Sequence, residues 1–162
     1  MKEKTAKKIR FLGKVLFVLY LAGLAYFLFF SERYGRTEPA NIVQYNFIPF
    51  KEIKRFWYNR ESLGYLASYM NLFGNILAFI PFGFCVPLMT KHRLGLFMTL
   101  FLIFAFSFVV ETVQLVTKVG CFDVDDMILN TIGGLIGFIA FWIINGIRRI
   151  VFGIKKKSEK KR

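Results

Sequence analysis

Four carboxylates stand out in a chain that is otherwise rich in apolar and basic residues. Asp123, Asp125 and Asp126 occur in the stretch CFDVDDMILNTIGG (121–134), and Glu111 occurs in SFVVETVQ (107–114). Carboxylates placed in this way could hold a cation, contact a cationic headgroup or transfer a proton. An ionisable group near the bilayer centre costs about 2.5–3.5 kcal/mol on insertion scales, so Glu111 is expected to face the protein interior or water.

Glu111 shares one helical face with two other polar residues. Ser107 lies four positions before it and Gln114 three positions after it, and such residues are neighbours on a helix. This pattern favours a site for a proton, a cation or a headgroup. The alternative is a hydrogen bond between helices that only fixes their packing.

The aspartates also have a structural interpretation. Asp125 or Asp126 could cap the helix that follows, because a carboxylate suits a helix N-terminus. Three neighbouring carboxylates repel one another, so Lys118, a basic residue of the segment 31–70, a cation or a cationic ligand should offset them. The spacing is not that of an EF-hand loop, so we assign no metal and no cofactor. No nucleophile–base pair is evident and we assign no catalytic residue, although Glu111 and Asp126 could act as an acid–base pair.

The elements that must position these residues are membrane helices. Hydrophobic residues make up 56% of the 162 residues, above the 45–50% or so of soluble domains. About 20 apolar residues are needed for each span, which predicts an all-α membrane protein, a bundle of four transmembrane helices at 11–30, 71–89, 94–116 and 127–146. The membrane domain covers 11–147, with an extracytoplasmic loop at 31–70, between a basic arm (1–10) and a basic tail (148–162).

The charges predict the orientation of the helices. Most of the 23 Lys and Arg residues lie in the arm, in the loop around Lys91 and Arg93, and in the tail, so these segments and both termini should be cytoplasmic. The net charge of +13 then suits anionic lipids, and we predict no nucleic-acid binding. The polar ends of three spans meet on the outer side, in a predicted pocket that consists of Asn46, Asn75, Glu111, Gln114, Asp123, Asp126 and Asn130.

Two further patterns concern packing and the loop. NFIPFKEIKRFWYN (46–59) has apolar residues at helical spacing with basic residues between them, which predicts a short amphipathic helix in the outer interface or an aromatic belt without a recognition role. Gly133 and Gly137 form a small-xxx-small pair that should allow close helix approach. Pro81 should kink the second span.

The motifs NFIPF (46–50), GNILAFIPFG (74–83), SFVVETVQ (107–114) and GCFDVDDMILNTIGG (120–134), in this order, resemble the VanZ-like family. The resemblance implies a multi-pass protein of the bacterial cell membrane. It also implies an association with low-level resistance to teicoplanin, a glycopeptide that carries an acyl chain where vancomycin has none. A membrane protein could therefore act on teicoplanin alone.

Three classes of function are compatible with the sequence. In the leading one, the predicted pocket binds a lipid headgroup, a wall precursor or the lipoglycopeptide itself, without catalysis, among membrane lipids as partners. The second is an enzyme that modifies an envelope lipid or polymer. The third is a structural partner of another envelope protein. The oligomeric state is not predicted.

Overall fold

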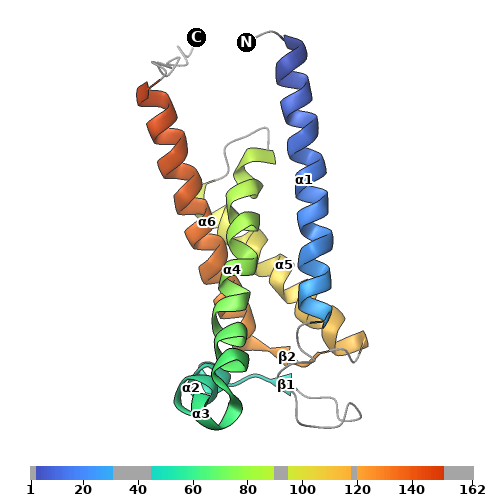
Figure 1. The fold of residues 1–162 in the computed structure, drawn as a ribbon, viewed down its shortest axis with the longest axis vertical. Helices are drawn as coiled ribbons and strands as arrows, with labels where there is room; N and C mark the ends of the chain where they lie inside the picture. Colours follow the sequence, from blue (N-terminus) through green and yellow to red (C-terminus); the bar gives the residue numbers. More distant parts are fainter. Residues whose placement is uncertain (1–2, 31–44, 90–94, 118–119, 152–162) are drawn as a thin grey trace.

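The computed structural model describes residues 3–30, 45–89, 95–117 and 120–151. Figure 1 shows long helices that run along the molecule and two very short strands at one end. The element order is α1 (Glu3–Phe30), β1 (Tyr45–Asn46), α2 (Lys51–Tyr58), α3 (Arg60–Leu63), α4 (Tyr65–Met89), α5 (Leu96–Thr117), β2 (Phe122–Asp123) and α6 (Val124–Val151). The start of α1 and the last turn of α6 lie at the same end, and β1, β2, α2 and α3 lie at the opposite end (Figure 1).

Among the described residues, three helices are long and apolar enough to cross a membrane, namely Tyr65–Met89, Leu96–Thr117 and Val124–Ile147. The prediction of a mostly helical membrane protein is therefore confirmed. The second span begins six residues before the predicted position 71, because a helix can continue through polar residues that interrupt an apolar run. The fourth begins three residues before 127, where two aspartates in the first turn favour the positive end of the helix dipole.

The first helix, α1, is 28 residues long. Within its described residues, the apolar part is Lys14–Tyr26. The hydroxyl of Tyr20 donates a hydrogen bond of 2.6 Å to the carbonyl of Ala78 in α4. This contact ties α1 to the other long helices, and its role as a fourth span stays a prediction.

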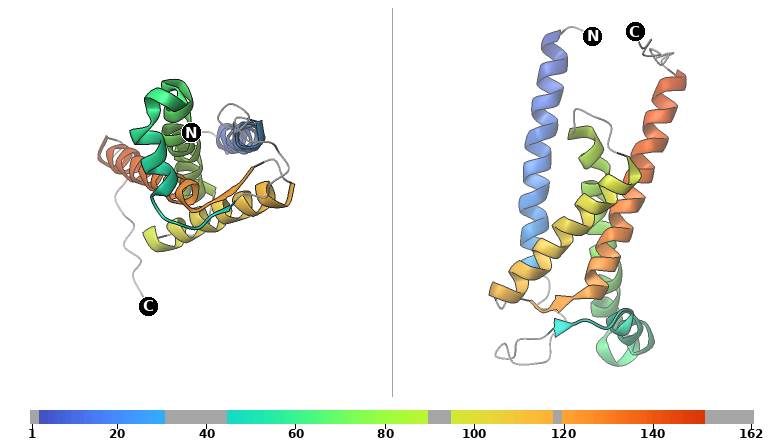
Figure 2. Two further views of the ribbon diagram at one scale, coloured as in Figure 1. Left: turned by 90° about the horizontal axis from the view of Figure 1, so that it is seen from below. Right: turned by 180° about the vertical axis from the view of Figure 1, so that it is seen from behind.

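Helices α4 and α6 pack against each other through glycines. A Cβ atom on Gly133 would lie 2.1 Å from the carbonyl oxygen of Ile76, and one on Gly137 would lie 2.0 Å from that of Ile80. Real Cβ atoms do not approach an oxygen so closely, so only glycine permits this helix separation. The predicted close approach at Gly133 and Gly137 is confirmed. Helix α5 crosses this pair obliquely (Figure 2).

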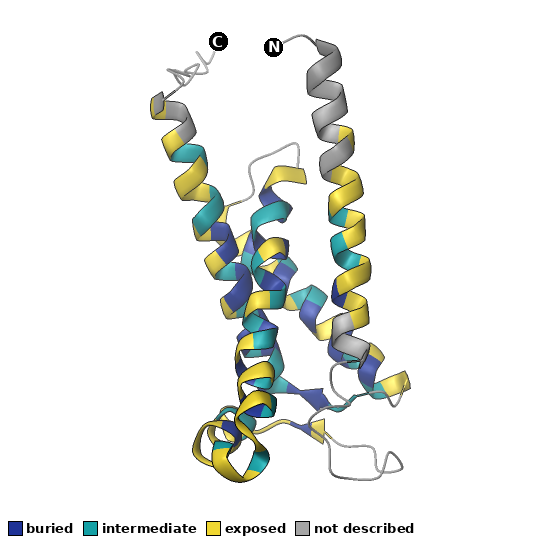
Figure 3. Cartoon of the chain, in the orientation of Figure 1, coloured by how far each residue is buried: buried dark blue, intermediate teal, exposed yellow. Residues whose placement is uncertain are grey.

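The main apolar core lies between α1, α4 and α5, and α6 approaches it at Gly134, which lies against the side chain of Ile103. Phe79 and Ile103 are completely buried, and the rings of Phe82 and Phe106 stack with centroids 4.5 Å apart. Figure 3 shows that buried residues are concentrated on the facing sides of these helices, whereas their outer sides are exposed. This distribution is expected of helices whose outer sides contact lipid rather than water.

The end of the molecule that carries α2 and α3 contains a pair of short strands that the sequence did not predict. β1 and β2 pair in parallel, with Tyr45 opposite Phe122 and Asn46 opposite Asp123. The predicted amphipathic helix within 46–59 is present as α2, and the buried Phe56 packs against Leu72 of α4. Because β2 leads directly into α6, the pairing brings the segment before α2 next to the start of that helix.

Candidate functional site

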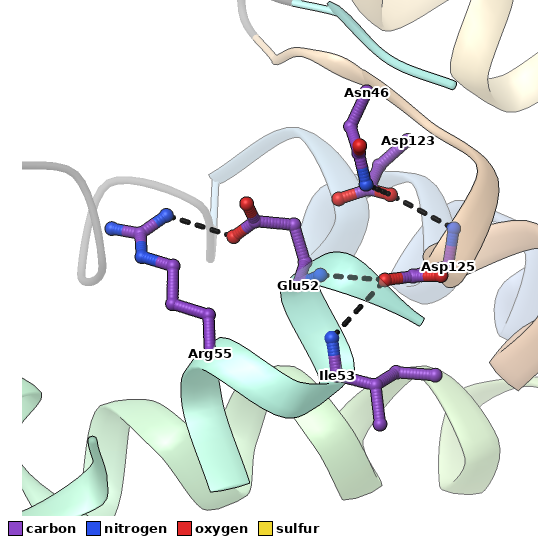
Figure 4. Close-up of polar contacts among 6 residues, drawn as sticks. All are labelled: Asn46, Glu52, Ile53, Arg55, Asp123 and Asp125. Atoms are coloured by element: carbon purple, nitrogen blue, oxygen red, sulfur yellow. Dashed lines mark hydrogen bonds and ion pairs between the residues drawn. The ribbon is translucent and has the colours of Figure 1, made fainter. Parts of the chain in front are cut away.

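Asp125 caps helix α2 from another part of the chain. Its side chain is 1% exposed, and its Oδ2 atom accepts hydrogen bonds from the backbone N–H groups of Glu52 (2.7 Å) and Ile53 (3.1 Å). Its Oδ1 atom accepts one from the N–H of Phe50. Figure 4 shows the carboxylate pointing at the first turn of α2. The first N–H groups of a helix have no partner within the helix, so this carboxylate satisfies α2 in place of a local cap.

The backbone at Phe50 contributes to this arrangement. Phe50 has a φ of 64° and forms no side-chain cap for α2. This left-handed conformation is unfavourable for a non-glycine residue and costs on the order of 1–3 kcal/mol. The surrounding contacts must stabilise it, and they include the hydrogen bonds to Asp125 and a backbone hydrogen bond of 3.4 Å from Lys51 to Ile48 across the turn.

Asp123 caps α6. It immediately precedes the helix, and its Oδ1 atom accepts a hydrogen bond of 2.8 Å from the N–H of Asp125. The same oxygen accepts one of 3.0 Å from the side-chain amide of Asn46, whose own oxygen accepts the N–H of Ile48 at 3.2 Å. The prediction that Asp125 or Asp126 caps this helix is wrong. The capping residue is Asp123, because Asp125 is oriented towards α2.

The pKa of Asp123 is raised from its ordinary value. Burial is the main cause, and the nearby carboxylates of Asp125 and Glu52 raise it further. The hydrogen bonds from the backbone of Asp125 and the side chain of Asn46 act in the opposite direction. N–H groups therefore stabilise the negative charge of Asp123. Lys118, one of the predicted counter-charges, lies outside the described residues.

Glu111 links α5 to the start of α6. Its side chain is 1% exposed, and its Oε2 atom accepts a hydrogen bond of 3.0 Å from the backbone N–H of Asp123. The sequence predicted that Glu111 faces the protein interior or water, and the structure places it in the interior. Both carboxylates lie beside the same short strand, β2, so the charge of Glu111 is placed next to the helix cap.

Two further hydrogen bonds join the long helices. Asn75 of α4 donates to Asp126 of α6 at 2.6 Å, and Asn130 of α6 donates to the hydroxyl of Ser107 of α5 at 2.9 Å. Asn130 is completely buried, and its Oδ1 atom accepts no hydrogen bond from the part of the chain that the structure describes. Gln114 is 1% exposed, one turn beyond Glu111. A buried amide oxygen without a hydrogen-bond donor is unfavourable. The Oδ1 atom of Asn130 therefore marks a position suited to a donor group.

We call these residues together the polar cluster, which comprises Asn46, Asn75, Ser107, Glu111, Gln114, Asp123, Asp125, Asp126 and Asn130. All seven predicted pocket residues belong to it. The predicted pocket did not include Asp125 and Ser107, although Ser107 was placed on the same helical face as Glu111. The partners of Asp125 are backbone groups more than 70 positions away, so its role in capping α2 was not predicted. Within the described residues, no group of three or more His, Cys, Asp or Glu side chains could hold a metal ion.

Comparison with known proteins identifies the relatives of this chain. The family model for VanZ/LLP1 matches residues 17–145. The chain belongs to the VanZ/LLP1 family. A curated relative, "Protein VanZ" of Enterococcus faecium, is 27% identical over 138 residues, which cover 84% of this chain and 77% of the relative. No solved structure matches the chain. The range matched to VanZ/LLP1 contains the whole polar cluster, so the cluster belongs to the family domain rather than to the basic ends.

Proposed function

We propose that this chain is a multi-pass protein of the bacterial cell membrane that contributes to glycopeptide (teicoplanin) resistance or to cell-envelope homeostasis. In this proposal α1, α4, α5 and α6 all cross the membrane and both termini are cytoplasmic. Two observations support this topology. The start of α1 and the end of α6 lie at one end of the molecule (Figure 1), and the basic residues of 1–10 and 148–162 favour the cytoplasmic side. The polar cluster then faces the outer side.

The polar cluster engages a lipid headgroup, a wall precursor or the drug. The observation that carries this proposal is a buried group of hydrogen-bond acceptors at the point where α6 begins. Among them, the Oδ1 atom of Asn130 still lacks a donor within the described residues. A hydroxyl, amide or ammonium group can supply one, and headgroups, wall precursors and glycopeptides carry such groups.

Family membership supports the phenotype. The VanZ resemblance links the family to teicoplanin resistance, and the curated relative is named Protein VanZ. The acyl chain of teicoplanin would bring this drug, and not vancomycin, to a site at the membrane. Selectivity for the acylated drug is therefore the expected signature of the proposed function.

Drug susceptibility in a sensitive Gram-positive host tests the proposal. Wild type, Glu111→Gln and Asp126→Asn are compared on teicoplanin and vancomycin, with membrane levels checked by immunoblot. A matched control is Glu61→Gln, because Glu61 is an exposed carboxylate outside the cluster whose contact is the hydroxyl of Tyr65 at 3.3 Å. Teicoplanin protection that Glu61→Gln keeps and the cluster variants lose supports the proposal. No protection by well-expressed wild type refutes the resistance function.

A structural role is the second candidate, and one observation favours it. The carboxylates of Asp123 and Asp125 are occupied by N–H groups of the protein itself. A purely structural cluster predicts that cluster variants matter only when they lower the amount of folded protein and that a specific partner co-purifies. An enzyme predicts instead that Glu111→Gln alone abolishes function at normal expression, whereas a binding site predicts graded losses at several positions.

A further inference from the structure

The surface formed by β1, α2 and the segment between them carries aromatic and basic side chains together. Its exposed apolar residues are Tyr45, Phe47, Ile48, Phe50, Trp57 and Tyr58. Lys51, Lys54 and Arg55 are also exposed, and Figure 3 shows most of this end as exposed. The opposite side of α2 already packs against the long helices through Phe56. The aromatic and basic side chains therefore form a second, largely exposed face, on which Phe47 also contacts the ring of Phe122.

The hydrogen bonds described above fix the level of this face along the molecule. Asp125, which holds the first turn of α2, is the second residue of α6, whose membrane-capable part begins at Val124. The chain that follows α2 also leads directly into a span, because α3 ends at Leu63 and the span Tyr65–Met89 begins after Gly64. Figures 1 and 2 show α2 and α3 lying across the long axis, beside the start of both spans. In a bilayer this is the level of the headgroups.

Two of the basic side chains at this end of the molecule already have partners in the protein. Arg55 forms a salt bridge of 2.7 Å with Glu52. Arg60 donates to the carbonyl of Trp57 at 2.6 Å, and its guanidinium lies 5.6 Å from the centre of that ring. Lys51 and Lys54 have no such partner in the described part of the chain. The ammonium groups of these two lysines, beside exposed aromatic rings, are complementary to a negatively charged interface.

We propose that the exposed face of α2 binds the headgroups of anionic phospholipids. Lys51 and Lys54 contact the lipid phosphates, and the rings of Trp57 and Tyr58 enter the boundary between headgroups and acyl chains, where such amphipathic rings are favoured. The polar cluster holds α2 at this depth through Asp125. This inference requires only that the chain is embedded in a membrane, and it does not depend on drug resistance.

Fluorescence of Trp57 tests the proposal, because the chain has two tryptophans and Trp142→Phe leaves only this one. The full chain is placed in nanodiscs of a zwitterionic phosphatidylcholine. About one tenth of the lipid is replaced by phosphatidylglycerol or phosphatidylcholine brominated near the headgroup. A basic residue at a charged surface favours the anionic lipid about fivefold. Brominated phosphatidylglycerol should therefore quench Trp57 several times more strongly than brominated phosphatidylcholine.

Charge variants separate a specific contact from a general attraction. Lys51→Gln together with Lys54→Gln should make the two brominated lipids equally effective. The control, Lys14→Gln, removes an exposed lysine of α1 and should keep the preference. Equal quenching by both lipids in the parent protein refutes the proposal, as does a preference that the double variant retains. Quenching by aqueous iodide without any quenching by brominated lipid shows that α2 faces water and also refutes it.

Discussion

The substitution Asp125→Ala should release helix α2 while the long helices stay folded. The Asp125 carboxylate is 1% exposed and accepts three N–H groups at the first turn of α2. Loss of a capping side chain costs about 1–2 kcal/mol, and a buried donor left without a partner costs about 1–3 kcal/mol. Since some of the donors reach water once α2 opens, we expect a cost of about 3 kcal/mol for the attachment of α2.

The conservative variant, Asp125→Asn, should keep some of the hydrogen bonds that Asp125→Ala loses. Its amide oxygen can replace Oδ2, which accepts the N–H groups of Glu52 and Ile53. Its NH2 group then faces the N–H of Phe50, where the carboxylate had an acceptor. One of three hydrogen bonds is lost and a donor meets a donor, so we expect an intermediate cost of about 1–2 kcal/mol.

The test is the rate of hydrogen–deuterium exchange in residues 50–58, measured by mass spectrometry on the protein in nanodiscs. A cost of about 3 kcal/mol corresponds to about 100-fold faster exchange for Asp125→Ala, and Asp125→Asn should show about tenfold. The control is Glu52→Gln, which keeps the backbone N–H that Asp125 accepts but removes the salt bridge with Arg55 and the repulsion with Asp123. It should change exchange by about twofold or less. If Asp125→Ala exchanges at the wild-type rate, the carboxylate does not hold α2 and the reasoning fails.

Two further predictions concern helix packing and pH. Gly137→Ala should lower unfolding stability in detergent by at least about 1–3 kcal/mol, because its Cβ would lie 2.0 Å from the carbonyl oxygen of Ile80. The control Gly146→Ala meets nothing within 4 Å and should keep or slightly raise the stability, because alanine is the better helix former. Equal stabilities of the two variants would contradict the packing. Burial raises the pKa of Asp123, so the native state binds the proton of this carboxyl group more tightly than the unfolded state does. The resulting stabilisation is complete below the pKa of the unfolded state and is lost as pH rises through the pKa of the folded state. Unfolding measured from about pH 4 upwards should show this loss in wild type and a smaller one in Asp123→Asn, and identical profiles would refute the assignment to Asp123.

The sequence alone determined the helices and the residue types that meet at one end. A run of about 20 apolar residues must form its hydrogen bonds internally in a bilayer, so helix is the structure it adopts. Polar residues at the ends of three such runs are brought to one level by helix length alone, which is why Asn75, Glu111 and Asn130 could be predicted as neighbours. The glycine spacing at Gly133 and Gly137 likewise predicted a close contact, since small residues at this interval leave a groove on a helix.

Only the tertiary structure decided what each carboxylate does. Any of the three aspartates could cap a helix on local grounds, because capping requires only an acceptor near free N–H groups. The parallel pairing of β1 with β2 places the first turn of α2 beside Asp125, so that Asp123 caps its own helix and Asp125 caps a distant one. The donors are backbone N–H groups, which every residue except proline carries, so the order of side chains contains no signal for this choice.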